Sequence, residues 1–201
     1  MRFLPYWSVV WILRAFFLLG FSVRVEGSHN LRSEGSCILC SNHVSWLDPP
    51  LLAATSRRPV HFMAKRELFE VPVLGALLSR ILAFPVDRGR GDRRAIKRAL
   101  QVLGEGECVG MFPEGTRARE GVPRVFLRGA AYLAVRSGAP IIPIGISGSY
   151  GFRSRMTIRV GEPIIPSSLG RSGAELGRAV GDLTAEVFEE IEVLSSVQPR
   201  G

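Results

Sequence analysis

From residue 37 onward, short apolar runs alternate with amphipathic ones, and this alternation limits the folds open to the chain. Runs such as CILCS (37–41) and PIIPIGIS (140–147) have the composition of buried strands, and segments with helical spacing of apolar residues lie between such runs. Strands that alternate with helices are typical of parallel strands joined by crossover helices. We therefore predict a single α/β domain with a mostly parallel, mixed central sheet flanked by helices.

The individual elements follow from periodicity and from end signals. We expect strands within residues 36–42, 59–65, 81–88, 107–115, 140–147 and 155–164, and helices within 49–56, 73–80, 93–103, 126–137 and 173–194. Asp92 is placed to cap the helix that follows it. Asp48 precedes two prolines, which is a common helix start, so we expect it at the cap of its helix.

Length and charge limit the number of domains and the kind of partner. The 201 residues suffice for one domain with a real core. Lys and Arg exceed Asp and Glu, giving a net charge of +8, which suits nucleic acid, anionic lipid or a phosphate-bearing substrate. The basic residues are scattered, and the sequence has neither an aromatic RNA-binding motif nor zinc-finger spacing. We therefore expect no nucleic-acid partner.

The three cysteines, Cys37, Cys40 and Cys108, are too few for a disulfide framework. Cys37 and Cys40 have the CxxC spacing of some metal and redox sites. They lie in a predicted strand, however, where positions three apart point to opposite faces. We expect buried, reduced thiols.

The segment from Leu4 to Val23 is about as long as a bilayer crossing, which takes roughly 20 residues. Arg14 lies in its middle, where a charge costs about 2.5 kcal/mol or more on insertion. A helix in the membrane interface fits this charge best. A full span, with Arg14 snorkelling or meeting a partner, and a buried soluble helix remain open. We predict that residues 1–25 form a membrane-anchoring helical segment and that residues 26–201 form the α/β domain.

Polar clusters follow four of the predicted strands. They are Asn42-His43 with Asp48, Lys65-Arg66, Asp87-Arg88, and Glu114-Gly115-Thr116-Arg117. Ligands of open α/β sheets bind at the carboxyl ends of the strands. If the strands are parallel, all four clusters open onto one edge of the sheet.

The residues of each cluster can be interpreted as part of a functional site or as ordinary structural residues. His43 can accept a proton from a hydroxyl, with Asp48 holding the other ring nitrogen. Alternatively, Asp48 only caps its helix and His43 is an ordinary loop histidine, which the spacing alone favours. The cations can hold phosphate or can be solvated surface charges. Glu114 can order Arg117, bind a substrate hydroxyl or belong to a simple turn.

Taken together, the motifs resemble a known family. The segments NHVSWLDP, FMAKREL, FPVDRG, FPEGTR and APIIPIGI occur in this order between Ser36 and Ser147. In this respect the chain resembles the 1-acylglycerol-3-phosphate acyltransferases, the PlsC-like lysophospholipid acyltransferases. The ordered blocks make the chemical reading of His43 and Asp48 the better one.

The resemblance implies transfer of a fatty acyl group from acyl-CoA or acyl-carrier protein to the sn-2 hydroxyl of 1-acylglycerol 3-phosphate, giving phosphatidic acid. It implies His43 and Asp48 as the catalytic pair. It also implies a substrate-binding set of Lys65, Arg88, Glu114, Gly115, Thr116 and Arg117. No metal is implied, and no cofactor besides the acyl donor. The implied partners are a lysophospholipid acceptor and membrane lipid, at the cytoplasmic face of the cell membrane.

Other functions remain open. Leu127 stands where the family pattern suggests a basic residue. The acceptor could be another lysophospholipid or a glycolipid. A lipid hydrolase would need a nucleophile on a strained elbow, and GISGS (145–149) does not fit that pattern. A non-catalytic lipid-binding protein would have no use for the His43 and Asp48 pair.

Overall fold

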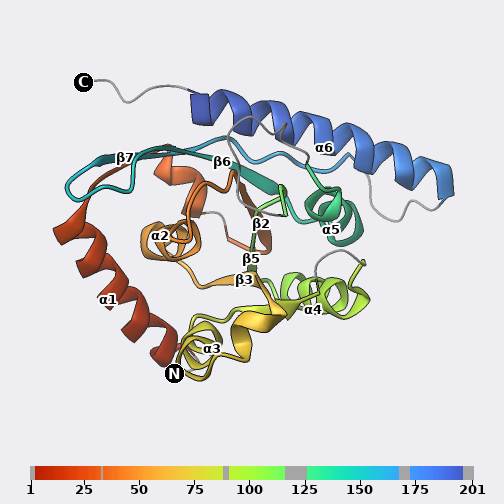
Figure 1. Ribbon diagram of the computed structural model, residues 1–201. Coiled ribbons are helices and arrows are strands. Elements are labelled where there is room, and N and C mark those ends of the chain that lie inside the picture. Colours follow the sequence, from red (N-terminus) through yellow and green to blue (C-terminus); the bar gives the residue numbers. More distant parts are fainter. Residues whose placement is uncertain (1–2, 33, 88–90, 116–125, 168–172, 197–201) are drawn as a thin grey trace.

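The computed structural model describes residues 3–32, 34–87, 91–115, 126–167 and 173–196 (Figure 1). Within these residues, seven strands form one mixed sheet in the order β1-β7-β6-β2-β5-β3-β4. The strands are β1 (Ser22–Glu26), β2 (Cys37–Ser41), β3 (Val60–Lys65), β4 (Phe84–Val86), β5 (Cys108–Met111), β6 (Ile141–Gly148) and β7 (Arg155–Val160). Neighbouring strands are parallel except β6 and β7. The predicted fold class is confirmed.

Helices cover both faces of the sheet (Figure 1). The α-helices are α1 (Leu4–Gly20), α2 (Asp48–Thr55), α3 (Pro72–Arg80), α4 (Arg93–Gly104), α5 (Gly129–Ser137) and α6 (Gly173–Ser196), and two 3₁₀ helices are η1 (Ser28–Arg32) and η2 (Arg66–Phe69). Side chains of α1 and α2 share one core cluster with the sheet, and those of α4, α5 and α6 share the other. The sheet is therefore the middle layer of three.

The central strand β2 shows how the sequence builds this sandwich. Cys37 and Leu39 lie in the cluster under α1 and α2, whereas Ile38 and Cys40 lie in the cluster under α4 to α6. A strand that is buried on both faces needs an unbroken apolar run, and CILCS provides it. The two cysteines of the CxxC spacing point to opposite faces, as predicted. Cys108, across from Cys37 on β5, is also a buried free thiol.

Helix α1 packs on α2, and its central cation serves this contact. Arg14 donates hydrogen bonds to two carbonyl oxygens at the C-terminus of α2, from Nε to Ala54 O (2.8 Å) and from Nη2 to Ser56 O (2.9 Å). A cation is favourable there because the last carbonyl groups of a helix carry partial negative charge. The charge in the middle of the apolar segment is thus matched inside the protein.

The N-terminal segment also contributes to the sheet. After α1, strand β1 pairs in parallel with β7, so the strand runs across the boundary predicted at residue 25. Among the helices that the structure describes, none combines the length and the apolar character needed to cross a bilayer.

Two predicted element ends are confirmed or corrected by local geometry. Asp92 caps α4 as predicted, because its side chain accepts from the backbone N–H groups of Arg94 and Ala95. The strand predicted over 81–88 is only Phe84–Val86. The chain leaves α3 through a Schellman turn, with Ala83 N donating to Leu78 O and Leu82 in the left-handed region at φ 61°. Glycine usually takes that position, so a leucine there gave no sign of the turn.

Candidate active site

The candidate site lies where β2 ends, at the carboxyl edge of its parallel neighbours. Asn42 follows the strand, and its side chain pairs with the backbone of Ile146 on β6: Nδ2 donates to Ile146 O (2.9 Å), and Oδ1 accepts from Ile146 N (2.7 Å). These two hydrogen bonds extend the pairing of β2 with β6 by one residue, through a side chain in place of the backbone. It thereby fixes the point from which the next residue, His43, leaves the sheet.

His43 and Asp48 are brought together, as predicted. His43 Nδ1 and Asp48 Oδ2 are 2.7 Å apart, and Asp48 is completely buried while His43 is 9% exposed. Since an ionised carboxylate can only accept, Nδ1 carries the proton and Nε2 is left as the basic nitrogen of a neutral ring. The pair has the geometry of a general base with its orienting carboxylate.

The predicted capping role of Asp48 is wrong in its detail. The N-cap of α2 is Leu47, without a side-chain cap bond, and Asp48 is the first helical residue. The Asp48 carboxylate points back over the preceding turn, where Oδ2 also accepts from Val44 N and Ser45 N, each at 2.7 Å. Asp48 therefore orders the loop that carries His43. It binds both the imidazole and the backbone N–H groups of that loop, and not the N–H groups of its own helix.

Two residues from the segment after β5 also contact His43, one at the ring and one at the backbone. The ring of Phe112, just after β5, stacks on the His43 ring with centroids 4.3 Å apart and an interplanar angle of 27°. Glu114 Oε1 accepts from the backbone N–H of His43 (3.3 Å). Glu114 was predicted to bind substrate, and the structure joins it to the loop that carries His43. Phe112 was not singled out from the sequence, where it is one aromatic among many.

Tyr150 is a further residue of the site that sequence reasoning missed. Its hydroxyl donates a short hydrogen bond to Asp48 Oδ1, from a position two residues beyond the end of β6. Burial raises the pKa of Tyr150, and the negative charge of Asp48 raises it further. The phenol therefore stays protonated and remains a donor. Its place after a predicted strand was the one available signal.

The other predicted site residues are placed less completely. Lys65 ends β3 and forms an exposed ion pair with Glu67 Oε1 at 2.9 Å. Gly115 closes a turn with φ +67°, a backbone conformation that favours glycine. Arg88, Thr116 and Arg117 lie outside the described residues.

Neighbouring charges stiffen the edge of the sheet beside Lys65. Arg66 makes a two-pronged contact with Asp87, from Nε to Oδ1 (2.5 Å) and from Nη2 to Oδ2 (2.8 Å). Asp92 Oδ2 accepts from Asp87 N (2.9 Å). Arg66 thus connects η2 to Asp87, the first residue after β4. Within the described ranges, no group of three or more His, Cys, Asp or Glu side chains is gathered as a metal site would need.

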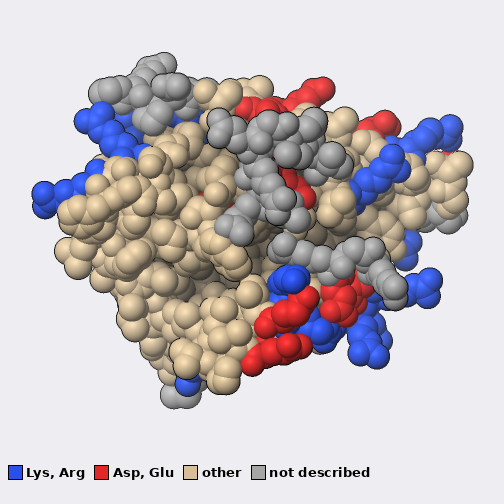
Figure 2. Space-filling model, viewed as in Figure 1, with Lys and Arg blue, Asp and Glu red and all other residues tan. Residues whose placement is uncertain are grey.

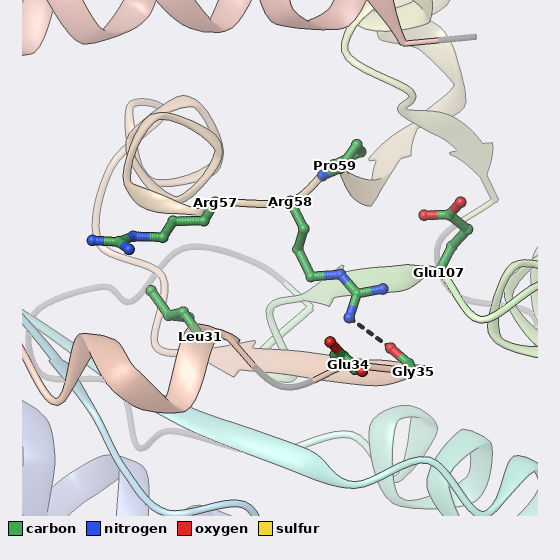
Figure 3. A pocket seen from close by; sticks show the side chains of 7 residues that line it. All are labelled: Leu31, Glu34, Gly35, Arg57, Arg58, Pro59 and Glu107. Carbon is green, nitrogen blue, oxygen red and sulfur yellow. Dashed lines mark hydrogen bonds between the residues drawn. The ribbon is translucent and has the colours of Figure 1, made fainter. Parts of the chain in front are cut away.

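A pocket of about 420 Å³ lies at the other edge of the sheet (Figure 3). It is lined by Leu31, Glu34, Gly35, Arg57, Arg58, Pro59 and Glu107. Gly35, Pro59 and Glu107 precede β2, β3 and β5, whereas His43 follows β2. Arg58 spans the pocket wall and donates to the carbonyl oxygens of Gly35 (2.6 Å) and Gly106 (2.7 Å). This pocket is separate from the His43 site.

The fold and the site define an α/β enzyme with a histidine–aspartate pair at the carboxyl edge of a largely parallel sheet. The family model described as Acyltransferase matches residues 22–147, well over half of the chain. The chain belongs to this acyltransferase family, as the sequence motifs indicated.

Named relatives agree with the family. A 1-acyl-sn-glycerol-3-phosphate acyltransferase of Bacillus subtilis is 35% identical over 148 residues, which cover 71% of this chain and 73% of the relative. A lyso-ornithine lipid O-acyltransferase of Pseudomonas aeruginosa is 32% identical over 163 residues, which cover 80% of this chain and 61% of the relative. The crystal structure of the 1-acyl-sn-glycerophosphate acyltransferase PlsC of Thermotoga maritima superposes with a TM-score of 0.71 at 27% identity, covering 97% of this chain and 81% of that one.

Proposed function

We propose that the protein transfers a fatty acyl group from acyl-CoA or acyl-carrier protein to the sn-2 hydroxyl of 1-acylglycerol 3-phosphate, giving phosphatidic acid. The observation that carries this proposal is the 2.7 Å contact between His43 Nδ1 and Asp48 Oδ2 in a nearly buried site. It leaves Nε2 as a base for a hydroxyl that the substrate itself supplies. The names of the Bacillus and Thermotoga relatives support this acceptor.

The proposed reaction needs one proton carrier. His43 Nε2 takes the proton from the acceptor hydroxyl as the oxygen attacks the thioester carbonyl carbon, so a C–O bond forms. Asp48 stabilises the positively charged imidazole at this stage. The tetrahedral intermediate then collapses, the C–S bond breaks, and His43 returns the proton to the departing thiolate. The products are the ester and a free thiol, and His43 is neutral again.

The acceptor's phosphate is expected beside the neighbouring strands. Lys65 ends β3, which lies two strands from β2, or about 10 Å at the usual strand spacing. A long lysine side chain at that distance can reach toward a phosphate while the sn-2 hydroxyl is at His43. We assign Arg88 and Arg117 to the same phosphate, with Gly115 and Thr116 shaping the loop. Arginine binds phosphate through two parallel hydrogen bonds, so Arg117→Ala should raise KM for the acceptor more than for the donor.

We also infer that the protein works on a membrane surface, at the cytoplasmic face. The exposed large apolar side chains of α1 are Leu4, Trp11, Ile12, Phe16, Leu18 and Leu19. Because Arg14 is directed to α2, this face of α1 carries no charge in the described residues. It continues onto α3 through Val73, which is 84% exposed, and Figure 2 shows a largely uncharged surface over both helices. Such a surface suits a helix lying in the interface.

The test of the catalytic proposal is His43→Ala, with His29→Ala as the matched control. His29 is exposed and lies in η1, away from the site. The His43 variant should remain folded but lose acyl transfer from both donor types onto lysophosphatidate, and the His29 variant should keep full activity. Near-normal turnover of His43→Ala would exclude the general-base role. Faster acylation of a lyso-ornithine lipid than of lysophosphatidate would instead favour the acceptor named for the Pseudomonas relative.

The membrane proposal is tested separately with Leu19→Asp, because Leu19 is 77% exposed on α1. Its control is Val193→Asp, at a 60% exposed position of α6 on the other side of the sheet. In a flotation assay with phosphatidylcholine vesicles that contain phosphatidic acid, the Leu19 variant should bind at least several-fold more weakly and the Val193 variant like the parent. Equal binding of the two variants would mean that α1 is not the lipid-binding face.

A further inference from the structure

We propose that Tyr150 is a positioning residue that holds the Asp48 carboxylate in register with His43. The inference rests on the proposed role of His43 as the general base. Tyr150 lies outside the matched family region, which ends at residue 147, and its hydroxyl reaches Asp48 from a turn 102 residues further along the chain.

The two oxygens of Asp48 have separate partners. Oδ2 accepts from His43 Nδ1 and from the backbone N–H groups of Val44 and Ser45. Oδ1 accepts from the Tyr150 hydroxyl. Because Asp48 is completely buried, a carboxylate oxygen left without a donor would be costly. Tyr150 therefore satisfies Oδ1 and prevents the carboxylate from rotating away from the imidazole.

Tyr150 is itself held by elements on both sides of the turn. The turn follows β6, whose Ile146 pairs with the Asn42 side chain. The Tyr150 ring makes an edge-to-face contact with Phe21 at the end of α1, with centroids 6.0 Å apart. The far end of the turn is bound to α1 as well, since Arg153 N donates to Gly20 O (2.7 Å). The phenol thus has a defined position independent of Asp48.

A neutral phenol at this place has a chemical effect besides orientation. By donating to Oδ1, it withdraws part of the negative charge that Asp48 would otherwise direct at the imidazole. Loss of the hydroxyl should stabilise the protonated imidazole in the resting enzyme. The acid limb of the pH–rate profile should then move to higher pH.

The experiment compares Tyr150→Phe with Tyr132→Phe in the full-length protein. Phe keeps the ring contact with Phe21 and removes only the hydroxyl. Tyr132 lies on α5, on the opposite face of the sheet, and its variant should behave as the parent. For Tyr150→Phe we expect kcat for acylation of lysophosphatidate to fall on the order of tenfold. KM for both substrates should be unchanged within about twofold, and the midpoint of the acid limb should rise by a few tenths of a pH unit or more.

A double-mutant cycle separates positioning from a general loss of structure. If Tyr150 acts through Asp48, then Tyr150→Phe should add little further loss in an Asp48→Asn background. An unchanged kcat and pH midpoint in Tyr150→Phe, or losses that multiply in the double variant, would overturn the proposal. The pH midpoint belongs to the folded fraction, so it decides the question even if Tyr150→Phe lowers stability. Activity of His43→Ala would refute the general-base role itself, whatever Tyr150 does.

Discussion

Arg14 offers the sharpest test of how the N-terminal helix is used. Arg14 is the one charge in the middle of an apolar segment. In the structure it donates two hydrogen bonds to carbonyl oxygens at the C-terminus of α2. The guanidinium also lies over the rings of Trp11 (4.9 Å) and Trp7 (5.6 Å). Arg14→Met keeps much of the aliphatic stem and removes these interactions. We expect α1 to dock less firmly on α2.

The size of the loss follows from the contacts. Hydrogen bonds to a charged group contribute about 1.5–3 kcal/mol each, and a partly exposed pair that shares one guanidinium contributes less than twice that. The apolar methionine offsets some of the loss, so we expect a net destabilisation of about 3 kcal/mol. For a chain of this length, that lowers Tm by about 6–12 °C.

The assay is thermal unfolding, measured together with vesicle binding. The matched control is Arg24→Met, because Arg24 is an exposed cation of β1 paired with Glu26 at 3.1 Å. Its loss should change stability by about 0.5 kcal/mol or less. If Arg14 were instead a tolerated charge in a membrane span, its removal would favour insertion by about 2.5 kcal/mol and leave Tm unaltered. A Tm of Arg14→Met within about 1 °C of the parent would refute the docking role.

Three further changes test other parts of the fold. Burial raises the pKa of Tyr6 from 10.0 to about 12, so its contribution to stability is complete below pH 10 and is lost as pH rises toward 12. Relative to Tyr6→Phe, the wild type should therefore lose up to about 3 kcal/mol of unfolding free energy in alkali, which denaturant titrations at several pH values would detect. A difference in unfolding free energy between the two proteins that does not change with pH would contradict this. Gly145→Ala should lower unfolding free energy by about 1–3 kcal/mol or more, because a Cβ there would lie 2.3 Å from the backbone carbon of Leu194 on α6. A stable variant by calorimetry would mean that α6 shifts freely. Asn42→Ala should cost about 2 kcal/mol and most of kcat, because both backbone groups of Ile146 lose their partner. Retained activity would show that the Asn42 bridge does not place His43.

The features that could be predicted from the sequence are those with local or periodic causes. The cap at Asp92 and the apolar stripe of α4 lie within a few residues of each other, so the helix and its start were both predicted correctly. The unbroken apolar run of β2 likewise reports a strand buried on both faces. The polar residues after β2, β3 and β5 were expected at one edge because parallel strands end together, and Glu114 after β5 does contact the backbone of His43 after β2.

The features that could not be predicted depend on contacts between distant segments. The partners of Arg14 lie on another helix, and nothing near Arg14 in the sequence identifies them. Tyr150 binds Asp48 only because β6 lies beside β2 and the following turn folds back to α1. Strand β1 has an ordinary composition, and its pairing partner β7 was not deducible from it. The end of α3 at Leu82 could not be predicted, because the left-handed conformation found there is unusual for leucine.

The parallel pairing of β1 with β7 also sets the order in which the chain can fold during synthesis. Ser22 pairs with Arg155, and the last partner of β1 is Arg159. At 5–20 residues per second, β1 leaves the ribosome roughly 7–27 s before its partner strand does. Throughout that interval the apolar segment that forms α1 adjoins a strand segment whose partner has not yet been made. A bilayer or a chaperone near the ribosome can therefore engage α1 before the catalytic domain has closed.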